Sequence, residues 1–265
     1  TGHKETFKYD GNEKSVDGYD VSITQGSTYT TEDFTFNGNA EVKATAAGTY
    51  PMGLQVSDFS NNNANYSTVT FVVNDGSLTI NPKSIVPDGP DTPDEKKTGI
   101  TVTDPEGSKY DGEEHKNKPT VTDTKTGVTL VENTDYTLAY SDNVIDAGEV
   151  TVTIIGANNY TGRFNVTYHI TQRSVTLTSG SASKVYDKKA LTKNEVTVSG
   201  DGFAKEEGAT YNVTGSQTEK GSSDNEFTYT LKSNTKASNY SIEVKFGELK
   251  VTAEDGEVVV TITGH

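Results

Sequence analysis

The stretch from Leu130 to Thr171 limits the possible folds most tightly, because its apolar residues alternate with polar ones. Asp142-Asn143, Ala147-Gly148 and residues 156–159 supply turn-compatible residues between the alternating runs. A period of two is typical of half-buried strands. The stretch therefore predicts an antiparallel meander of three strands, with these alternating positions: Tyr136, Leu138, Tyr140; Val150, Val152, Ile154; Phe164, Val166, Tyr168, Ile170.

Two short patterns recur and divide the chain into similar modules. An alternating strand, a small-residue turn and a Tyr-Asp pair occur in residues 100–112 (ITVTDPEGSKYDG) and again in residues 175–187 (VTLTSGSASKVYD). Residues 1–11 hold only the later part of this pattern, so we expect the first module to lack its leading strand. Asn-Tyr-Ser/Thr opens a later strand in each module, and Gly76 and Gly247 each precede a final strand with two apolar residues on one face. Repeats of this kind usually keep their ends and vary their interior loops.

The motifs from Leu130 onward carry a family resemblance. They read L-x-x-x-x-D-Y-x-x-x-Y-x-x-N, then A-G-x-x-x-V-x-I-x-G, then N-Y-x-G. This resembles the Tyr-Asp-Gly (MBG/YDG-type) repeat modules of large Gram-positive bacterial cell-surface proteins. The resemblance implies an extracellular location, at the bacterial cell surface or in the cell wall.

We expect an all-β fold, an elongated array of three small antiparallel β modules that are either immunoglobulin-like sandwiches or β-grasp-like sheets. The predicted modules are residues 1–83, 99–172 and 173–253, and residues 254–265 are the leading strand of a following module. Residues 84–98 form a linker, for which the four prolines and the acidic run between Pro82 and Thr98 predict an extended, semi-stiff spacer. The second and third modules join without a linker, which predicts a stiffer junction there.

Composition narrows the classes of partner. A net charge of −15 and a pI of about 4.7 argue against nucleic acid, which needs clusters of Lys and Arg. The excess of acidic residues favours a well-solvated, soluble surface. The alternative is that an acidic patch recognises a partner. The absence of cysteine excludes disulfides and thiol catalysis. No apolar run reaches transmembrane length, so no membrane insertion is expected in these residues, and we expect any export signal or wall anchor to lie outside them.

Two repeated motifs are candidate sites, and each also has a structural interpretation. A Tyr ring beside a carboxylate is typical of a sugar-binding site. The structural interpretation is that Asp and Gly adopt the dihedral angles of a turn, while the Tyr buries its ring and its hydroxyl forms a hydrogen bond. The third copy replaces the Gly with Lys188, so the structural interpretation is favoured for all three copies: Tyr9-Asp10-Gly11, Tyr110-Asp111-Gly112 and Tyr186-Asp187-Lys188. N-x-Ser/Thr is a glycosylation pattern. A structural corner, with Tyr packed inward and Asn forming a backbone turn, is favoured at Asn65, Asn159 and Asn239; the pattern also fits Asn165 and Asn212.

Metal and cofactor chemistry find little support in the sequence. The histidines His3, His115, His169 and His265 are scattered. Four acidic residues are candidate calcium ligands but lack the D-x-[DN]-x-[DN]-G frame, so a solvated acidic linker is favoured for Asp88, Asp91, Asp94 and Glu95. No G-x-S-x-G elbow or phosphate-binding glycine loop occurs. We therefore expect no metal, no cofactor and no enzyme activity; isopeptide bonds, which proteins of this surface class sometimes carry, remain open.

The leading functional hypothesis is a non-enzymatic repeat segment of a bacterial surface protein that acts as a stalk or adhesin spacer. A binding module for host glycans or mucin is the alternative, with an accessory segment of a secreted glycan-degrading enzyme as a third possibility. Under the binding hypothesis the contacts come from loops 12–32, 53–64 and 201–226, which carry Tyr19, Tyr29, Phe59 and Phe203.

The two ends of the sequence predict a self-association. Thr1-Gly2-His3 recurs as residues 263–265, after an alternating strand at residues 257–263. We expect this strand to pair with the open edge beside Phe7 to Tyr9 of a neighbouring molecule, which gives a head-to-tail contact.

Overall fold

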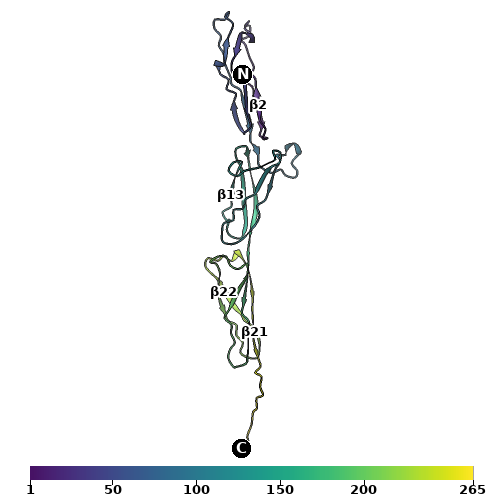
Figure 1. Cartoon of the computed structure of the whole chain (residues 1–265), viewed down its shortest axis with the longest axis vertical. Helices are drawn as coiled ribbons and strands as arrows, with labels where there is room; N and C mark the ends of the chain where they lie inside the picture. Colours follow the sequence, from purple (N-terminus) through teal and green to yellow (C-terminus); the bar gives the residue numbers. More distant parts are fainter. Residues whose placement is uncertain (265) are drawn as a thin grey trace. The chain divides into compact units, whose positions relative to one another are not determined.

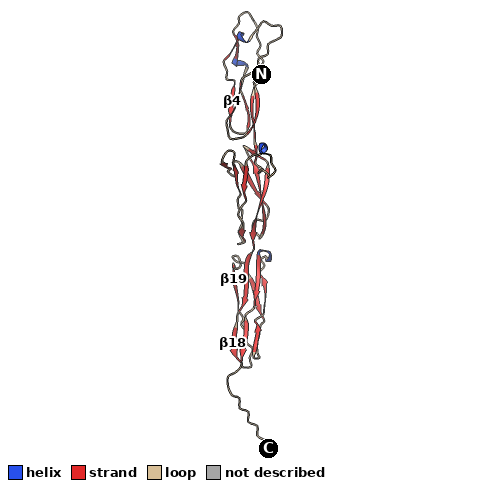
Figure 2. Cartoon of the chain, turned by 90° about the vertical axis from the view of Figure 1, so that its right-hand side faces the viewer, coloured by secondary structure: helices blue, strands red, loops and turns tan. Residues whose placement is uncertain are grey.

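The computed structural model describes residues 1–264, and their fold is all-β. Many small sheets account for the architecture, and the helical elements among these residues are short 3-10 turns (Figure 2). The 3-10 turns are η1 (Thr31–Asp33), η2 (Val56–Asp58), η3 (Asp94–Lys96) and η4 (Ala237–Asn239). Within this part of the chain, no helix is long and apolar enough to span a membrane.

The chain forms two compact units. The first comprises residues 1–105, 118–139 and 151–166, and the second comprises residues 106–117, 140–150 and 167–265. The division between them runs through the predicted module 99–172. The three-module division therefore remains a prediction.

The first unit contains five of the sheets. Their strands, in spatial order, are β1 (Lys4–Lys8), β7 (Ser77–Asn81) and β5 (Gly48–Pro51); β2 (Lys14–Asp17) and β4 (Glu41–Ala44); β3 (Phe34–Phe36) and β6 (Phe59–Asn61); β12 (Val128–Thr129), β11 (Thr120–Asp123) and β9 (Ile100–Thr103); and β15 (Tyr160–Thr161) and β8 (Lys83–Ser84). Figure 1 labels β2 among them.

The second unit contains three further sheets, and one sheet contributes residues to both units. The three are β19 (Val196–Gly200), β17 (Arg173–Ser179) and β23 (Tyr240–Lys245); β18 (Ala182–Val185), β24 (Glu248–Thr252) and β21 (Gly221–Asp224); and β20 (Ala209–Val213) and β22 (Phe227–Leu231). The shared sheet has the order β10 (Ser108–Lys109), β16 (Arg163–Thr171), β14 (Gly148–Gly156) and β13 (Tyr136–Tyr140).

The predicted meander is present as β13, β14 and β16, which are successive neighbours in the shared sheet. The alternation puts Val150, Val152 and Ile154 on the inner face, where each is fully buried. Tyr136 is buried as expected, but Tyr140 is only half-buried, because β13 is the edge strand and the Tyr140 hydroxyl donates to the Asn117 carbonyl oxygen at 3.1 Å.

Not every strand pair is antiparallel, which corrects the sequence-based expectation. Each strand before a Tyr-Asp pair runs parallel to the last strand of its repeat: β1 with β7, β10 with β16, and β18 with β24. β17 also runs parallel to β23, and β8 to β15. Local alternation specifies a strand but carries no information about the direction of a distant partner.

The segment 84–98 is a closed loop, and the expectation of an extended spacer is wrong. The Asp88 carboxylate accepts from the backbone N–H groups of Thr98 and Gly99, both at 2.7 Å, and so fastens the far end of the loop. The first residues of the segment are not part of the closed loop, because Ser84 belongs to β8, which is paired with β15, and Ile85 is fully buried. The chain therefore passes directly from β7 into β8, much as it passes from β16 into β17, and the prolines lie in an insertion after this junction.

The assignment of residues 254–265 to the leading strand of a following module stays a prediction. Residues 254–264 form no strand and are exposed, and they follow β24 as the yellow trace in Figure 1; His265 lies outside the described residues. Four large apolar side chains lie in this segment and are at least 74% exposed: Val258, Val259, Val260 and Ile262.

Candidate functional site

The Tyr-Asp pairs have a repeated structural role, as the sequence predicted. The backbone N–H of Tyr9, Tyr110 and Tyr186 donates at 2.9 Å to the last residue of the parallel partner strand. Each Asp then accepts a backbone N–H two residues later at 2.9–3.0 Å, which closes a turn. The third residue has a positive φ in every copy, 82° and 88° at the two glycines and 66° at Lys188. Lys188 thus adopts the left-handed turn without glycine.

Two of these tyrosines pack against the tyrosine of a later Asn-Tyr motif. Tyr9 contacts Tyr160, and Tyr110 contacts Tyr240, in both cases edge to face with ring centroids 5.6 Å apart. The paired rings belong to neighbouring sequence repeats. We call these two sites the tyrosine junctions.

Each tyrosine junction contains a carboxylate that accepts from one or both phenol hydroxyls. The Tyr160 hydroxyl donates to Asp123 at 3.2 Å. In the second junction, Glu207 accepts from Tyr240 at 2.7 Å and also from Tyr110. Burial, reinforced by the hydrogen bond to Glu207, raises the pKa of Tyr110 to about 12, and burial raises the pKa of Tyr240 as well. These phenols therefore remain neutral donors at physiological pH and are poor nucleophiles.

The Asn of the Asn-Tyr motif binds a remote backbone group, which corrects the expectation of a local turn. Asn159 accepts from the Ala47 N–H at 2.8 Å, and Asn239 accepts from the Ala147 N–H at 2.9 Å. Both alanines precede a glycine in the sequence. The remaining motif, at Asn65, lies outside the strands, and its neighbour Tyr66 packs on Tyr29 instead.

A basic residue follows the final strand at each junction, and sequence reasoning missed its role. Lys83 pairs with Asp123 at 2.5 Å, with both side chains buried. Arg173 donates to three carbonyl oxygens at 2.6–3.2 Å, those of Tyr110, Asp201 and Gly202. Lys83 lies beside Tyr160, and Arg173 beside Tyr240, in parallel registers. The only sequence signal was a cation shortly after the last apolar residue of each repeat.

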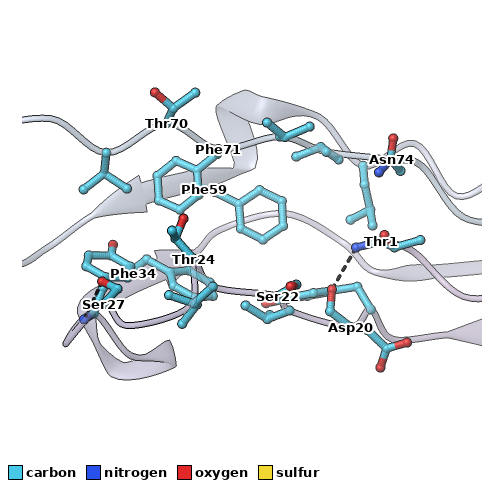
Figure 3. A pocket seen from close by; sticks show the side chains of 18 of the residues that line it. Thr1, Asp20, Ser22, Thr24, Ser27, Phe34, Phe59, Thr70, Phe71 and Asn74 are labelled. Carbon is cyan, nitrogen blue, oxygen red and sulfur yellow. Dashed lines mark hydrogen bonds between the residues drawn. The ribbon is translucent and has the colours of Figure 1, made fainter.

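A groove lies in the first unit, and Figure 3 shows it. It has a volume of about 540 Å³. Its walls are two chain segments, residues 19–24 and 68–74, and Thr1 lies at one end. We call this feature the N-terminal groove.

The N-terminal groove gathers most of the aromatic residues that the sequence singled out for ligand binding. Tyr19 and Phe59 contact each other with centroids 5.3 Å apart, and Tyr29 also lines the groove. Phe34 contacts Phe71 at 5.8 Å. Phe203 is elsewhere, packed on Tyr240. The structure therefore unites loops 12–32 and 53–64 but not loop 201–226.

The described titratable residues lie in separate small groups. Within residues 1–264, no three His, Asp or Glu side chains are placed to hold one ion. Asp88 binds backbone N–H groups, and Asp94 pairs with Lys97, so the acidic loop does not converge on a cation. The described histidines also lie apart, each beside a different acid: His3 with Asp20, His115 with Asp111 and His169 with Glu149.

Comparison with known families agrees with the resemblance seen in the motifs. Residues 1–82 match the family model of the MBG domain, a repeat module of surface proteins. No curated protein and no solved structure matches the chain.

Proposed function

We propose that this chain is a non-enzymatic repeat segment of a bacterial surface protein and acts as a spacer that carries a binding region away from the cell wall. The observation that carries the proposal is the duplicated tyrosine junction. The Tyr–Tyr ring pair and the bond from an alanine N–H to the Asn side chain recur between successive repeats, so the same two contacts join each repeat to the next.

The junction chemistry suits a load-bearing spacer. Each junction combines a continuous backbone passage, an edge-to-face ring pair and an Asn that holds a backbone N–H of the other repeat. The carboxylates and cations of the junctions fix the orientation of the side chains that they bind, because hydrogen bonds to charged groups have a preferred geometry. Nearest-neighbour contacts of this kind add stability repeat by repeat in linear arrays.

Small-angle scattering tests the spacer proposal directly. We expect a radius of gyration well above the roughly 18 Å of a compact globule of this length. Asn239→Ala removes the bonds to Ala147 and Asp146 and is expected to broaden the distance distribution. Asn212→Ala, on an exposed position of β20, is the matched control and should leave the distribution unchanged. A compact wild-type value would refute the proposal.

Host glycan binding is the second candidate, and the aromatic N-terminal groove is the observation that favours it. Three pairs of its rings meet edge to face, and Phe59 stacks on Phe71, so these ring faces and edges are already in contact with one another. A glycan array probed with the chain separates the two functions. Saturable binding that is lost in Tyr29→Ala would support the glycan function, and silence across the array would leave the spacer proposal.

A further inference from the structure

Two chain segments of the third repeat pair with each other along their whole length. We call residues 173–185 the entry segment, and it contains β17 and β18. We call residues 240–252 the exit segment, and it contains β23 and β24. β17 runs parallel to β23, and β18 runs parallel to β24. The start of the entry segment therefore lies beside the start of the exit segment, and their last residues also lie together.

The pairing keeps one register from the first strand pair to the second. Arg173 pairs with Tyr240 in the β17–β23 ladder, and Ala182 pairs with Leu249 in the β18–β24 ladder. Both pairs are separated by 67 residues in the sequence. The two ladders belong to different sheets. The entry and exit segments thus cross from one sheet to the other together, without a shift of register.

Serine side chains hold the two segments together where they cross between the sheets. The Ser179 hydroxyl accepts from the Gly247 N–H, and the Ser181 hydroxyl accepts from the Glu248 N–H, both at 3.0 Å. Beyond the second ladder, the Tyr186 N–H donates to the last residue of the exit segment at 2.9 Å. Hydrogen bonds therefore link the segments before, at and after the crossing.

A pull along the chain loads this pairing in shear. The chain enters the repeat at the start of the entry segment and leaves it at the end of the exit segment, and these two points are at opposite ends of the parallel pairing. The hydrogen bonds of a parallel ladder are evenly spaced and run between the strands. A pull therefore draws the two segments past each other and loads these bonds together. In the antiparallel β20–β22 ladder, by contrast, Ala209 pairs with Leu231, so a pull at these two residues would open the ladder one pair at a time.

The strand that takes the load at each end is the central strand of its sheet. β17 has β19 on its other side, and β24 has β21 on its other side. Both strands also carry core side chains, because Val175, Leu177, Leu249 and Val251 are at most 2% exposed. Neither strand can leave its sheet as an edge strand does, and their separation exposes the core of the repeat.

We propose that the entry and exit segments form a mechanical clamp, which keeps the third repeat folded while the chain carries tension. The clamp rests on the proposed spacer function, since a spacer between a cell wall and a binding region transmits every pull on that region. Its resistance comes from the direction of the load relative to the strands. The rate of forced unfolding is set by the unfolding barrier, and the clamp raises this barrier because several bonds must break at once.

Single-molecule pulling in two directions tests the clamp on the full chain, which has no native cysteine to compete for attachment of the handles. The variant Gln172→Cys with Ala253→Cys is pulled in shear. The variant Gln172→Cys with Ser238→Cys is pulled at the starts of both segments, which lie together because the Gln172 side chain donates to the Ser238 carbonyl oxygen at 2.8 Å. All three positions are exposed, and both variants lose this side-chain bond equally. Reducing buffer prevents a disulfide between positions 172 and 238 before the handles are coupled.

The same ladders should resist the two pulls differently. In the second variant the pull peels the segments apart pair by pair. In shear at least two more hydrogen bonds must break together, and each contributes about fivefold to the rate, so we expect unfolding at equal force to be slower in shear by about tenfold or more. Thermal unfolding without force should be the same for both variants, because the bonds are the same. Equal rates of forced unfolding in the two directions would overturn the clamp.

A matched pair of serine variants tests whether the bonds between the segments carry the load. Ser181→Ala removes the bond to the Glu248 N–H, which links entry to exit segment. Ser223→Ala is the control, because its hydroxyl donates to the Ser216 carbonyl oxygen at 3.4 Å, outside both segments. In the shear direction Ser181→Ala should speed unfolding by about fivefold, and Ser223→Ala by about twofold or less. Equal effects of the two variants would contradict the clamp.

Scattering keeps the clamp and the spacer proposal apart, because the radius of gyration is measured without force. A compact radius would refute the spacer function, whatever the pulling direction does to the unfolding rate. An extended radius together with equal rates in both directions would refute the clamp and leave the spacer function standing.

Discussion

Tyr160 offers the most direct test of how the first tyrosine junction is stabilised. Its side chain is 4% exposed, its ring contacts Tyr9, and its hydroxyl donates to the buried Asp123. Truncation to alanine removes a large buried aromatic, which costs about 3–5 kcal/mol in protein cores. Tyr160→Phe removes only the hydroxyl, and we expect a loss of about 1.5 kcal/mol, at the low end for a hydrogen bond to a charged group, because Asp123 keeps its bond to Lys83.

The assay is thermal unfolding followed by calorimetry and circular dichroism. For a cooperative domain of 60–100 residues, 1 kcal/mol shifts the midpoint by about 4–8 °C, so Tyr160→Ala should lower its transition by about 20 °C. Tyr229→Ala is the control, because Tyr229 is 37% exposed on β22, and it should cost about 1 kcal/mol or less.

A double-mutant cycle then isolates the contact between the two rings. Tyr9→Ala and Tyr160→Ala together should be less damaging than the sum of the single changes by about 1 kcal/mol, the value for an edge-to-face pair. Additive effects would mean that the rings touch without stabilising each other. An unchanged midpoint for Tyr160→Ala would refute the assignment of this residue to the core.

Three further predictions follow from local contacts. Tyr110 loses its proton near pH 10 in the unfolded chain but has a pKa of about 12 in the folded chain. The free energy of unfolding should therefore fall as the pH rises from about 10 to 12. Urea titrations of Tyr110→Phe should show a smaller fall over the same range. Gly247→Ala should destabilise strongly, because a Cβ there would lie 2.4 Å from the Ser179 carbonyl oxygen, while Gly256→Ala, with open space around it, should leave the melting temperature unchanged. Lys83→Met should lower the free energy of unfolding by about 3–5 kcal/mol, because it leaves the Asp123 carboxylate buried without its cation. The double variant Lys83→Met with Asp123→Leu should recover part of this stability in a denaturant titration. If it recovers none, the unpaired carboxylate is not the cause of the loss.

Local chemistry was enough to predict several elements. Alternation placed β13, β14 and β16, since the side-chain period of a strand is written directly in the sequence. The Tyr-Asp turns were also predictable, because an Asp that accepts the N–H two residues later needs no distant partner. Repetition of these local patterns suggested the Tyr-Asp-Gly family, and the MBG match of residues 1–82 supports it.

Long-range pairing was decided only by the tertiary structure. The parallel partners of β1, β10 and β18 lie 73, 62 and 67 residues away, and nothing in the alternation specifies their direction. The same limit hid the roles of Asn159 and Asn239, which accept N–H groups 112 and 92 residues away. Prolines predicted an extended segment at 84–98, but three hydrogen bonds to the Asp88 carboxylate close it into a loop. The N-terminal groove also required the tertiary structure, because its two walls, residues 19–24 and 68–74, lie far apart in the sequence.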